Sequence, residues 1–149
     1  MRHDAKDKRP LIVVLSKYDA WKALAPDIEL RKEWIFRELK QGLNLLNVRQ
    51  LQSVSKKLRE LLQQHSPEIV SISEAFSEDV IYIPVSALGC SPREIPDAPP
   101  IGDPPRRPLG VLAGEISPEW AEVPLLYAMH KTMPGIVGRS LEIPGKQTS

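Results

Sequence analysis

Two short apolar runs stand out in a chain whose other segments mix hydrophobic and polar residues. The first run is Leu11 to Leu15, which follows Pro10. The second run is Val80 to Val85, which follows Glu78 and Asp79. Both runs are continuous and rich in β-branched residues, which is typical of strands covered on both faces of a sheet. The pattern therefore predicts two strands, each followed at once by a short loop of polar or small residues.

Between these runs the apolar residues take the spacing of a helix. One stripe is apolar and the opposite side is charged or polar, which predicts an amphipathic crossover helix. The stripe consists of Leu51, Val54, Leu58, Leu61 and Leu62. Ser66 and Pro67 then suit an N-cap and a first helical position, so a second helix is expected to start there. Its expected apolar side is Ile69, Ile72 and Phe76.

Two further helices are predicted with weaker signals. The stretch from Leu30 to Leu39, around Trp34, has a helical pattern. Near the C-terminus, Ser117-Pro118-Glu119 repeats the helix-start signal, and apolar residues keep helical spacing until Pro134 and Gly135 stop them. These apolar residues are Leu126, Met129 and Met133. The order of elements is thus strand, helices, strand, loop and helix.

This order predicts an α/β fold in which the two strands are parallel neighbours joined by a right-handed crossover. Two strands make a small sheet for a chain of 149 residues. A strand that is covered on both faces also needs neighbours on its hydrogen-bonding edges. We therefore expect that a further strand belongs beside Leu11 to Leu15 and that the sheet of this chain is incomplete.

Composition narrows the functional classes. The chain is 42% hydrophobic and 26% charged, which is typical of one ordinary soluble domain. Its formal net charge of +1 gives no broad electrostatic field that would attract nucleic acid or anionic lipid. The run Leu11 to Leu15 is too short for a signal-peptide core or a membrane span, which predicts a cytoplasmic protein. Cys90 is the only cysteine, and the three histidines lack metal-ligand spacing, which argues against a disulfide or a zinc site.

Seven of the 15 prolines lie between Pro92 and Pro108, and this window is predicted to be a loop or linker. Its two P-x-x-P matches, at 96–99 and 105–108, are typical of polyproline ligands, but proline clustering alone also produces them. We expect one domain over residues 1–138 and a flexible tail over residues 139–149.

The residues after the two strands suit a guanine base. Ligands of doubly wound sheets bind beyond the carboxyl ends of the strands. There, the carboxylate of Asp19 can accept two parallel hydrogen bonds, and guanine offers a matching pair of donors in its N1–H and exocyclic amine. The stem of Lys17 can lie over the purine, and a backbone N–H near Ala87 can donate to the guanine O6. Alternatively, Asp19 only caps a helix that starts at Ala20.

These segments also resemble a known family. LIVVLSKYDAW is similar to the fourth GTPase motif, which is usually Asn/Thr-Lys-x-Asp after a strand, and YIPVSALG resembles the fifth motif, Ser-Ala-x. VLAGEISPEWAEVPLLYAM, from Val111 to Met129, resembles the segment that follows in bacterial double-GTPase-type domains, which are Ras-like P-loop GTPases of the TRAFAC class. The resemblance implies the C-terminal part of a Ras-like sheet. It implies guanine-binding roles for Ser16, Lys17, Asp19, Ser86, Ala87 and Leu88.

The chain departs from this family in several places. Ser16 stands where Asn or Thr is usual, and the spacer from Asp19 to Ser86 is longer than in a small Ras-like domain. No Gly-x-x-x-x-Gly-Lys-Ser/Thr occurs, and Gly145-Lys146-Gln147-Thr148 lacks a preceding strand and a following helix. No Asp-x-x-Gly follows a strand to hold magnesium. We therefore expect no GTP hydrolysis by this chain alone.

Two interpretations follow. The first is the guanine-recognition half of a bacterial GTPase-like domain, encoded as a truncated reading frame or as one half of a split protein. Its ligand would be GTP or GDP with Mg²⁺, bound only when an upstream half supplies the phosphate-binding residues. The alternative is a degenerate GTPase-like interaction module, which docks onto a partner protein through its unpaired strand edge.

Overall fold

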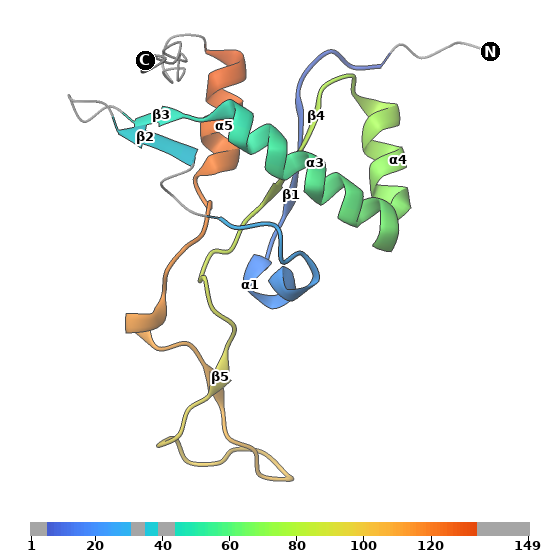
Figure 1. Cartoon of the computed structure of the whole chain (residues 1–149). Coiled ribbons are helices and arrows are strands. Elements are labelled where there is room, and N and C mark those ends of the chain that lie inside the picture. The colour runs from blue at the N-terminus through green and yellow to red at the C-terminus, as the bar shows by residue number, and fades with distance from the viewer. Residues whose placement is uncertain (1–5, 31–34, 39–43, 134–149) are drawn as a thin grey trace, which may run out of the picture.

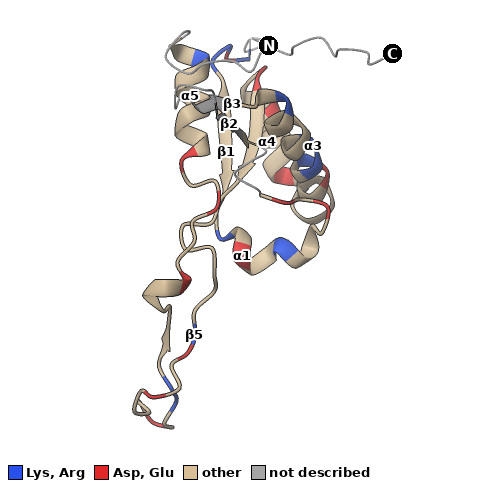
Figure 2. Cartoon of the chain, turned by 60° about the vertical axis from the view of Figure 1, so that its left-hand side comes forward, with Lys and Arg blue, Asp and Glu red and all other residues tan. Residues whose placement is uncertain are grey.

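A computed structural model describes residues 6–30, 35–38 and 44–133 of the chain. Its centre is a parallel pair of strands, β1 (Leu11–Leu15) and β4 (Val80–Pro84), which run in unbroken register. Helix α5 lies on one side of this pair, and α3 and α4 lie on the other (Figures 1 and 2). The predicted α/β class and the parallel pairing are confirmed. Strand β4 ends one residue earlier than the sequence predicted.

The crossover between the strands contains helices α3 (Val48–His65) and α4 (Pro67–Phe76). The side chain of Asn47 caps α3 by accepting a hydrogen bond from the Gln50 N–H at 3.2 Å. The predicted apolar stripe of α3 is confirmed, because four of its residues are buried and Leu61 is partly buried. The four are Leu51, Val54, Leu58 and Leu62.

Helix α4 starts where the sequence predicted, but it turns a different face inward. Its buried residues are Val70 and Ser73, whereas the predicted apolar side is exposed. Ile69 is 40% exposed, Ile72 is 69% exposed and Phe76 is 58% exposed. A polar contact helps to fix this rotation, since Arg59 of α3 holds the carboxylate of Glu74 at 2.5 and 2.8 Å. The prediction for this face was therefore wrong.

A short antiparallel pair, β2 (Phe36–Glu38) and β3 (Asn44–Leu46), precedes α3. The prediction of a helix over Leu30 to Leu39 is therefore wrong for residues 36–38, while Trp34 and Leu39 lie outside the described residues. Tertiary contacts override the local helical pattern here. Ile35 and Leu46 are buried in the core, and the Ile35 carbonyl accepts a hydrogen bond from the Asn47 N–H at 2.8 Å.

The proline-rich window forms a long arm that extends away from the sheet and helices (Figures 1 and 2). Two-residue strands, β5 (Arg93–Glu94) and β6 (Leu109–Gly110), pair in antiparallel fashion. Nearer the tip, Ile101 and Arg106 exchange backbone hydrogen bonds of 2.8 and 2.9 Å, so Pro105 lies within a turn. The loop predicted for this window is thus a hairpin.

Helix α5 (Val123–Thr132) begins later than the sequence predicted. Ser117-Pro118-Glu119 does not start a helix, because Glu119 is in an extended bridge with Ser86. Trp120 then turns the chain with a positive φ of 54°. The predicted end before Pro134 is confirmed, and the predicted tail at 139–149 lies outside the described residues. Within the described ranges, no helix has both the length and the apolar character that a membrane crossing requires.

The two outer edges of the β1–β4 pair differ. The Leu11 N–H donates to the Asp79 carbonyl at 2.8 Å, so alternate residues from Leu11 onward face β4 and the N–H groups of Ile12 and Val14 face the opposite edge. No other described strand pairs with β1 there, and the Val14 side chain is 47% exposed. Within the described residues this edge of β1 is therefore open.

The outer edge of β4 is covered instead. Here the Tyr82 N–H donates to the Ser55 Oγ of α3 at 2.9 Å, and Pro84 has no N–H to offer. Both features discourage another strand from pairing with β4. Sheet extension is therefore possible at β1 and blocked over the end of β4.

Candidate functional site

The loops after β1 and β4 meet at the carboxyl end of the sheet. Backbone pairing continues past the strands, because the Tyr18 N–H donates to the Val85 carbonyl at 3.0 Å. Lys17 has a left-handed conformation with φ 56°, which turns the chain into the short helix α1 (Tyr18–Trp21). The Trp21 indole N–H donates to the Ser16 carbonyl at 2.9 Å. Trp21 thus braces the loop that follows β1.

Asp19 and Ser86, which are 67 residues apart, are in direct contact: the Ser86 Oγ donates a hydrogen bond to the Asp19 Oδ1. The Ser86 Oγ also accepts from the Gly89 N–H at 2.9 Å, so its hydroxyl proton is free to point at Asp19. Ser86 is 1% exposed. The two segments that the sequence singled out are therefore brought together by a buried hydroxyl.

A second serine completes the contacts of this carboxylate. The Ser91 Oγ, at the base of the arm, donates to the Asp19 Oδ2 at 2.8 Å. The hydrogen bond from Ser86 is the main cause that lowers the pKa of Asp19, and the bond from Ser91 adds to it. Asp19 is consequently an ionised acceptor at neutral pH. Ser91 lies at the edge of the proline-rich window and belongs to no motif, so the sequence did not indicate it.

Asp19 does not act as the cap residue of α1. The helix begins at Tyr18 with Lys17 at the N-cap position, and no side chain bonds the cap. Asp19 lies within the first turn, where its negative charge is still favourable. The alternative in which Asp19 caps a helix that starts at Ala20 is therefore wrong.

The remaining predicted residues lie in the two loops that hold Asp19 and Ser86. Lys17 and Ala87 are exposed, and Leu88 is 39% exposed. The loop that holds Ala87 and Leu88 is fixed from the other end of the arm, because the Ser117 N–H donates to the Leu88 carbonyl at 2.9 Å. Gly89 has φ +73°, and a Cβ there would lie 1.8 Å from the Ser117 oxygen, so this approach requires glycine.

Glu119 is a second carboxyl group beside the site that the sequence did not indicate. Its backbone exchanges two hydrogen bonds of 2.9 Å with Ser86. Desolvation by burial is the main cause that raises the pKa of Glu119, with the nearby charge of Asp19 acting in the same direction and Lys22 opposing it. Its Oε2 is buried and has no hydrogen-bond partner. Glu119 is therefore less readily ionised than Asp19.

The tryptophans fit the predicted structural role where they are described. Trp120 is fully buried, and Trp21 packs against the core with its ring at 88° to that of Tyr18. Trp34 lies outside the described residues. The buried Tyr18 hydroxyl donates to the Ile28 carbonyl, which ties α1 to the segment that follows it.

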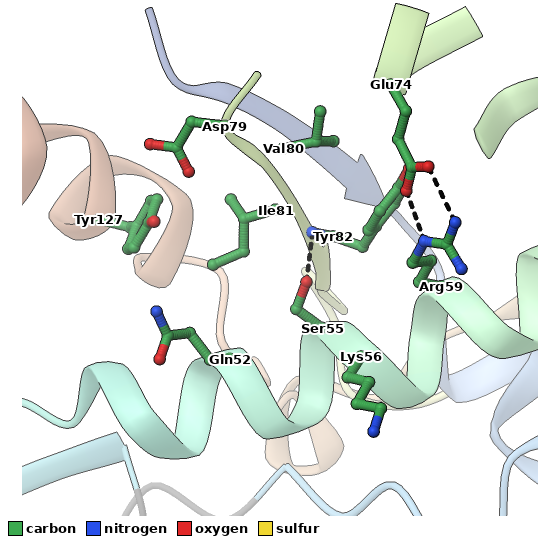
Figure 3. Close-up of a pocket in the computed structure, with 10 residues that line it drawn as sticks. All are labelled: Gln52, Ser55, Lys56, Arg59, Glu74, Asp79, Val80, Ile81, Tyr82 and Tyr127. Atoms are coloured by element: carbon green, nitrogen blue, oxygen red, sulfur yellow. Dashed lines mark hydrogen bonds and ion pairs between the residues drawn. The ribbon is translucent and has the colours of Figure 1, made fainter. Parts of the chain in front are cut away.

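A separate cavity of about 230 Å³ lies between α3, β4 and α5, toward the opposite end of β4 (Figure 3). Its charged groups are largely satisfied within the protein. Arg59 pairs with Glu74, and Lys131 donates to Asp79 at 2.6 Å. The Asp19 carboxylate does not line this cavity or the one of about 180 Å³ beside α3. The cavity of Figure 3 therefore offers no unpaired carboxylate to a ligand.

In the described part of the chain, no group of three or more His, Cys, Asp or Glu side chains is arranged to hold a metal ion. Comparison with known proteins adds no relative. No protein-family model, curated protein or solved structure matches the chain. The geometry around Asp19 and the motif resemblance therefore carry the functional argument.

Proposed function

We propose that this chain recognises the guanine base of GTP or GDP through the carboxylate of Asp19. The observation that supports this most is the hydrogen bond from Ser86 to Asp19, which joins the two sequence motifs at the carboxyl end of the parallel strands. An ionised carboxylate held in a fixed orientation is the acceptor that the N1–H and exocyclic amine of guanine require. Adenine lacks this pair of donors.

The other predicted residues have supporting roles in this proposal. Each carboxylate oxygen has two acceptor positions, so Ser86 can stay bonded to Oδ1 while the base approaches from solvent. The exposed stem of Lys17 covers one face of the purine, and a backbone N–H near Ala87 donates to O6. Leu88 shapes the loop, and Ser16 holds it through its carbonyl contact with Trp21.

We expect this chain by itself to bind nucleotide weakly. A phosphate-binding loop, whose backbone donors and lysine provide much of nucleotide affinity, does not occur in this sequence. We propose that an upstream half of a Ras-like bacterial GTPase domain supplies that loop and the magnesium site, on the open side of β1. In this arrangement GTP or GDP binds with Mg²⁺ between the two halves, in the cytoplasm.

Exchange of Asp19 for asparagine tests the proposal. In Asp19→Asn, the new amide donates where guanine also donates, but it matches the carbonyl that xanthine carries in place of the amine. We expect the preference for GDP over xanthosine diphosphate to reverse. NMR titrations of the full chain with both nucleotides at millimolar concentrations measure this ratio without requiring tight binding.

Asp27→Asn is the matched control, because Asp27 is exposed and lies outside the candidate site. It should keep the wild-type preference. An unchanged GDP to xanthosine diphosphate ratio in Asp19→Asn would remove Asp19 from the proposed site. In a complete domain that includes a phosphate loop, the same change should weaken GDP binding by about 2–4 kcal/mol, the scale for unpairing a buried charged hydrogen bond.

The open edge of β1 favours a second candidate function, that of a protein-interaction module. The outward N–H groups of Ile12 and Val14 have no strand neighbour among the described residues, and Val14 is 47% exposed. A strand from a partner protein can bond to this edge, as in other cases of β-augmentation. In this candidate the guanine motifs are retained for structure and Asp19 binds only serines.

A further inference from the structure

Ser91 lies at the base of the arm, and its hydroxyl donates to the carboxylate that guanine recognition needs. Its Oγ lies 2.8 Å from the Asp19 Oδ2, while Ser86 bonds the other oxygen. The two serines differ in position. Ser86 is buried beneath the carboxylate, whereas Ser91 is exposed on the solvent side. A base that approaches Asp19 from solvent therefore meets Ser91 and not Ser86.

We propose that Ser91 is a guard residue, which competes with the guanine base for the Asp19 Oδ2 and must be displaced when the base binds. This inference rests on the proposed guanine-binding function. The bidentate contact of guanine needs an acceptor position on both oxygens in the plane of the carboxylate. Each oxygen has two acceptor positions: the buried Ser86 leaves the solvent-facing position of Oδ1 free, whereas in this proposal the exposed Ser91 takes the solvent-facing position of Oδ2 and restrains the rotation of the group.

The position of Ser91 links this exchange to the arm. Strand β5 starts two residues later, at Arg93, and the Arg93 guanidinium contacts Glu115 on the returning side of the arm. Glu115 ends the short helix η2 (Ala113–Glu115), close to the Ser117 contact with Leu88. When a bound guanine displaces Ser91, the segment that leads into β5 therefore loses its contact with Asp19. The arm carries exposed apolar residues, including Ile101 and Leu109, that can report this change to a partner.

Ser91→Ala in the full chain tests the inference. Removal of one exposed hydrogen bond to the Asp19 carboxylate should tighten the binding of GDP by roughly 2- to 10-fold, which is about 0.4–1.4 kcal/mol at 1.4 kcal/mol per factor of ten. Ser91→Thr keeps a hydroxyl and should return the affinity toward that of the wild type. Ser117→Ala, at the other end of the arm, removes an exposed serine hydroxyl that does not contact Asp19 and should leave the affinity unchanged.

An NMR titration of the Asp19 carboxyl gives a readout that needs no nucleotide. Because the hydrogen bond from Ser91 helps to lower the pKa of Asp19, this pKa should rise in Ser91→Ala and stay low in Ser91→Thr. A raised pKa together with tighter GDP binding supports the guard role. An unchanged pKa, or a raised pKa with equal or weaker GDP binding, overturns it.

Failure of the underlying function has a different signature. If GDP perturbs none of the resonances near Asp19 in any variant, guanine recognition itself is refuted, and the guard role is refuted with it. In that case the Asp19 pKa would still respond to Ser91→Ala, because the contact between the two side chains does not depend on nucleotide.

Discussion

The hydrogen bond between Ser55 and the edge of β4 gives a stability prediction that the structure quantifies. Ser55 is 8% exposed and Tyr82 is 1% exposed, so the contact between them is shielded from bulk solvent, although both residues line the cavity of Figure 3. In Ser55→Ala, the Tyr82 N–H loses its protein acceptor at 2.9 Å. An unsatisfied buried backbone group costs about 1–3 kcal/mol.

A second effect acts in the opposite direction. Alanine has a higher helix propensity than serine, which favours either substitution in the middle of α3 by about 0.5 kcal/mol. Ser53 lies two residues earlier on the same helix and is exposed, so Ser53→Ala measures the propensity gain alone. We expect Ser53→Ala to stabilise the chain by about 0.5 kcal/mol. The net cost of Ser55→Ala is then about 0.5–2.5 kcal/mol.

Urea unfolding followed by far-ultraviolet circular dichroism is a suitable assay, because α3 and α4 supply much of the helical signal. The comparison requires equal slopes of free energy against urea, so that the midpoints report stability and not a change in the unfolded state. The decisive quantity is the difference in free energy of unfolding between Ser55→Ala and Ser53→Ala, which should be about 1–3 kcal/mol. If Ser55→Ala is as stable as Ser53→Ala, the Ser55 hydroxyl does not cap the edge of β4, and the argument that this edge is closed to further strands fails.

Two further predictions concern exposed apolar surface. The open edge of β1 should make the chain self-associate, which sedimentation velocity over a range of concentrations detects. Val14→Lys should abolish this association, whereas Leu24→Lys should not, because Leu24 is exposed outside β1 and lines the cavity beside α3. A wild-type chain that stays monomeric at every concentration would argue against an adhesive edge. On α4, Val70→Ala should cost about 2 kcal/mol in urea unfolding while Ile72→Ala costs less than about 0.5 kcal/mol. If Ile72→Ala costs more than Val70→Ala, the buried face of α4 is the one that the sequence predicted.

Sequence patterns predicted the elements that depend on local periodicity and on a general rule of sheet topology. The two apolar runs gave β1 and β4, and the stripe from Leu51 to Leu62 gave the buried face of α3. The placement of Asp19 beside Ser86 was also predictable, because the carboxyl ends of neighbouring parallel strands meet at one edge of a sheet. These features need no knowledge of side-chain contacts.

Features set by contacts between distant segments were missed. The face of α4 depends on small buried side chains and on the ion pair of Glu74 with Arg59, which is 15 residues away, and hydrophobic spacing contains neither signal. Ser91 reaches Asp19 only because the arm folds back beside the site, and the bridge to Glu119 replaces a plausible helix start. In each case a polar contact between residues distant in the sequence fixed a conformation that local sequence preference does not determine.

The wide separation of Asp19 and Ser86 along the chain has a consequence for the order of folding. The α3 and α4 helices are joined through Ser66 alone, so they can dock after closing a very short loop. The β1–β4 ladder, by contrast, must close a loop that spans the whole crossover, and its entropy cost rises with the logarithm of that length. We expect the helical pair to form first and the strands to join last. The carboxylate and its serine partners would then be separate groups until the final step, so any ligand that bridges the two loops would act on the folding equilibrium itself.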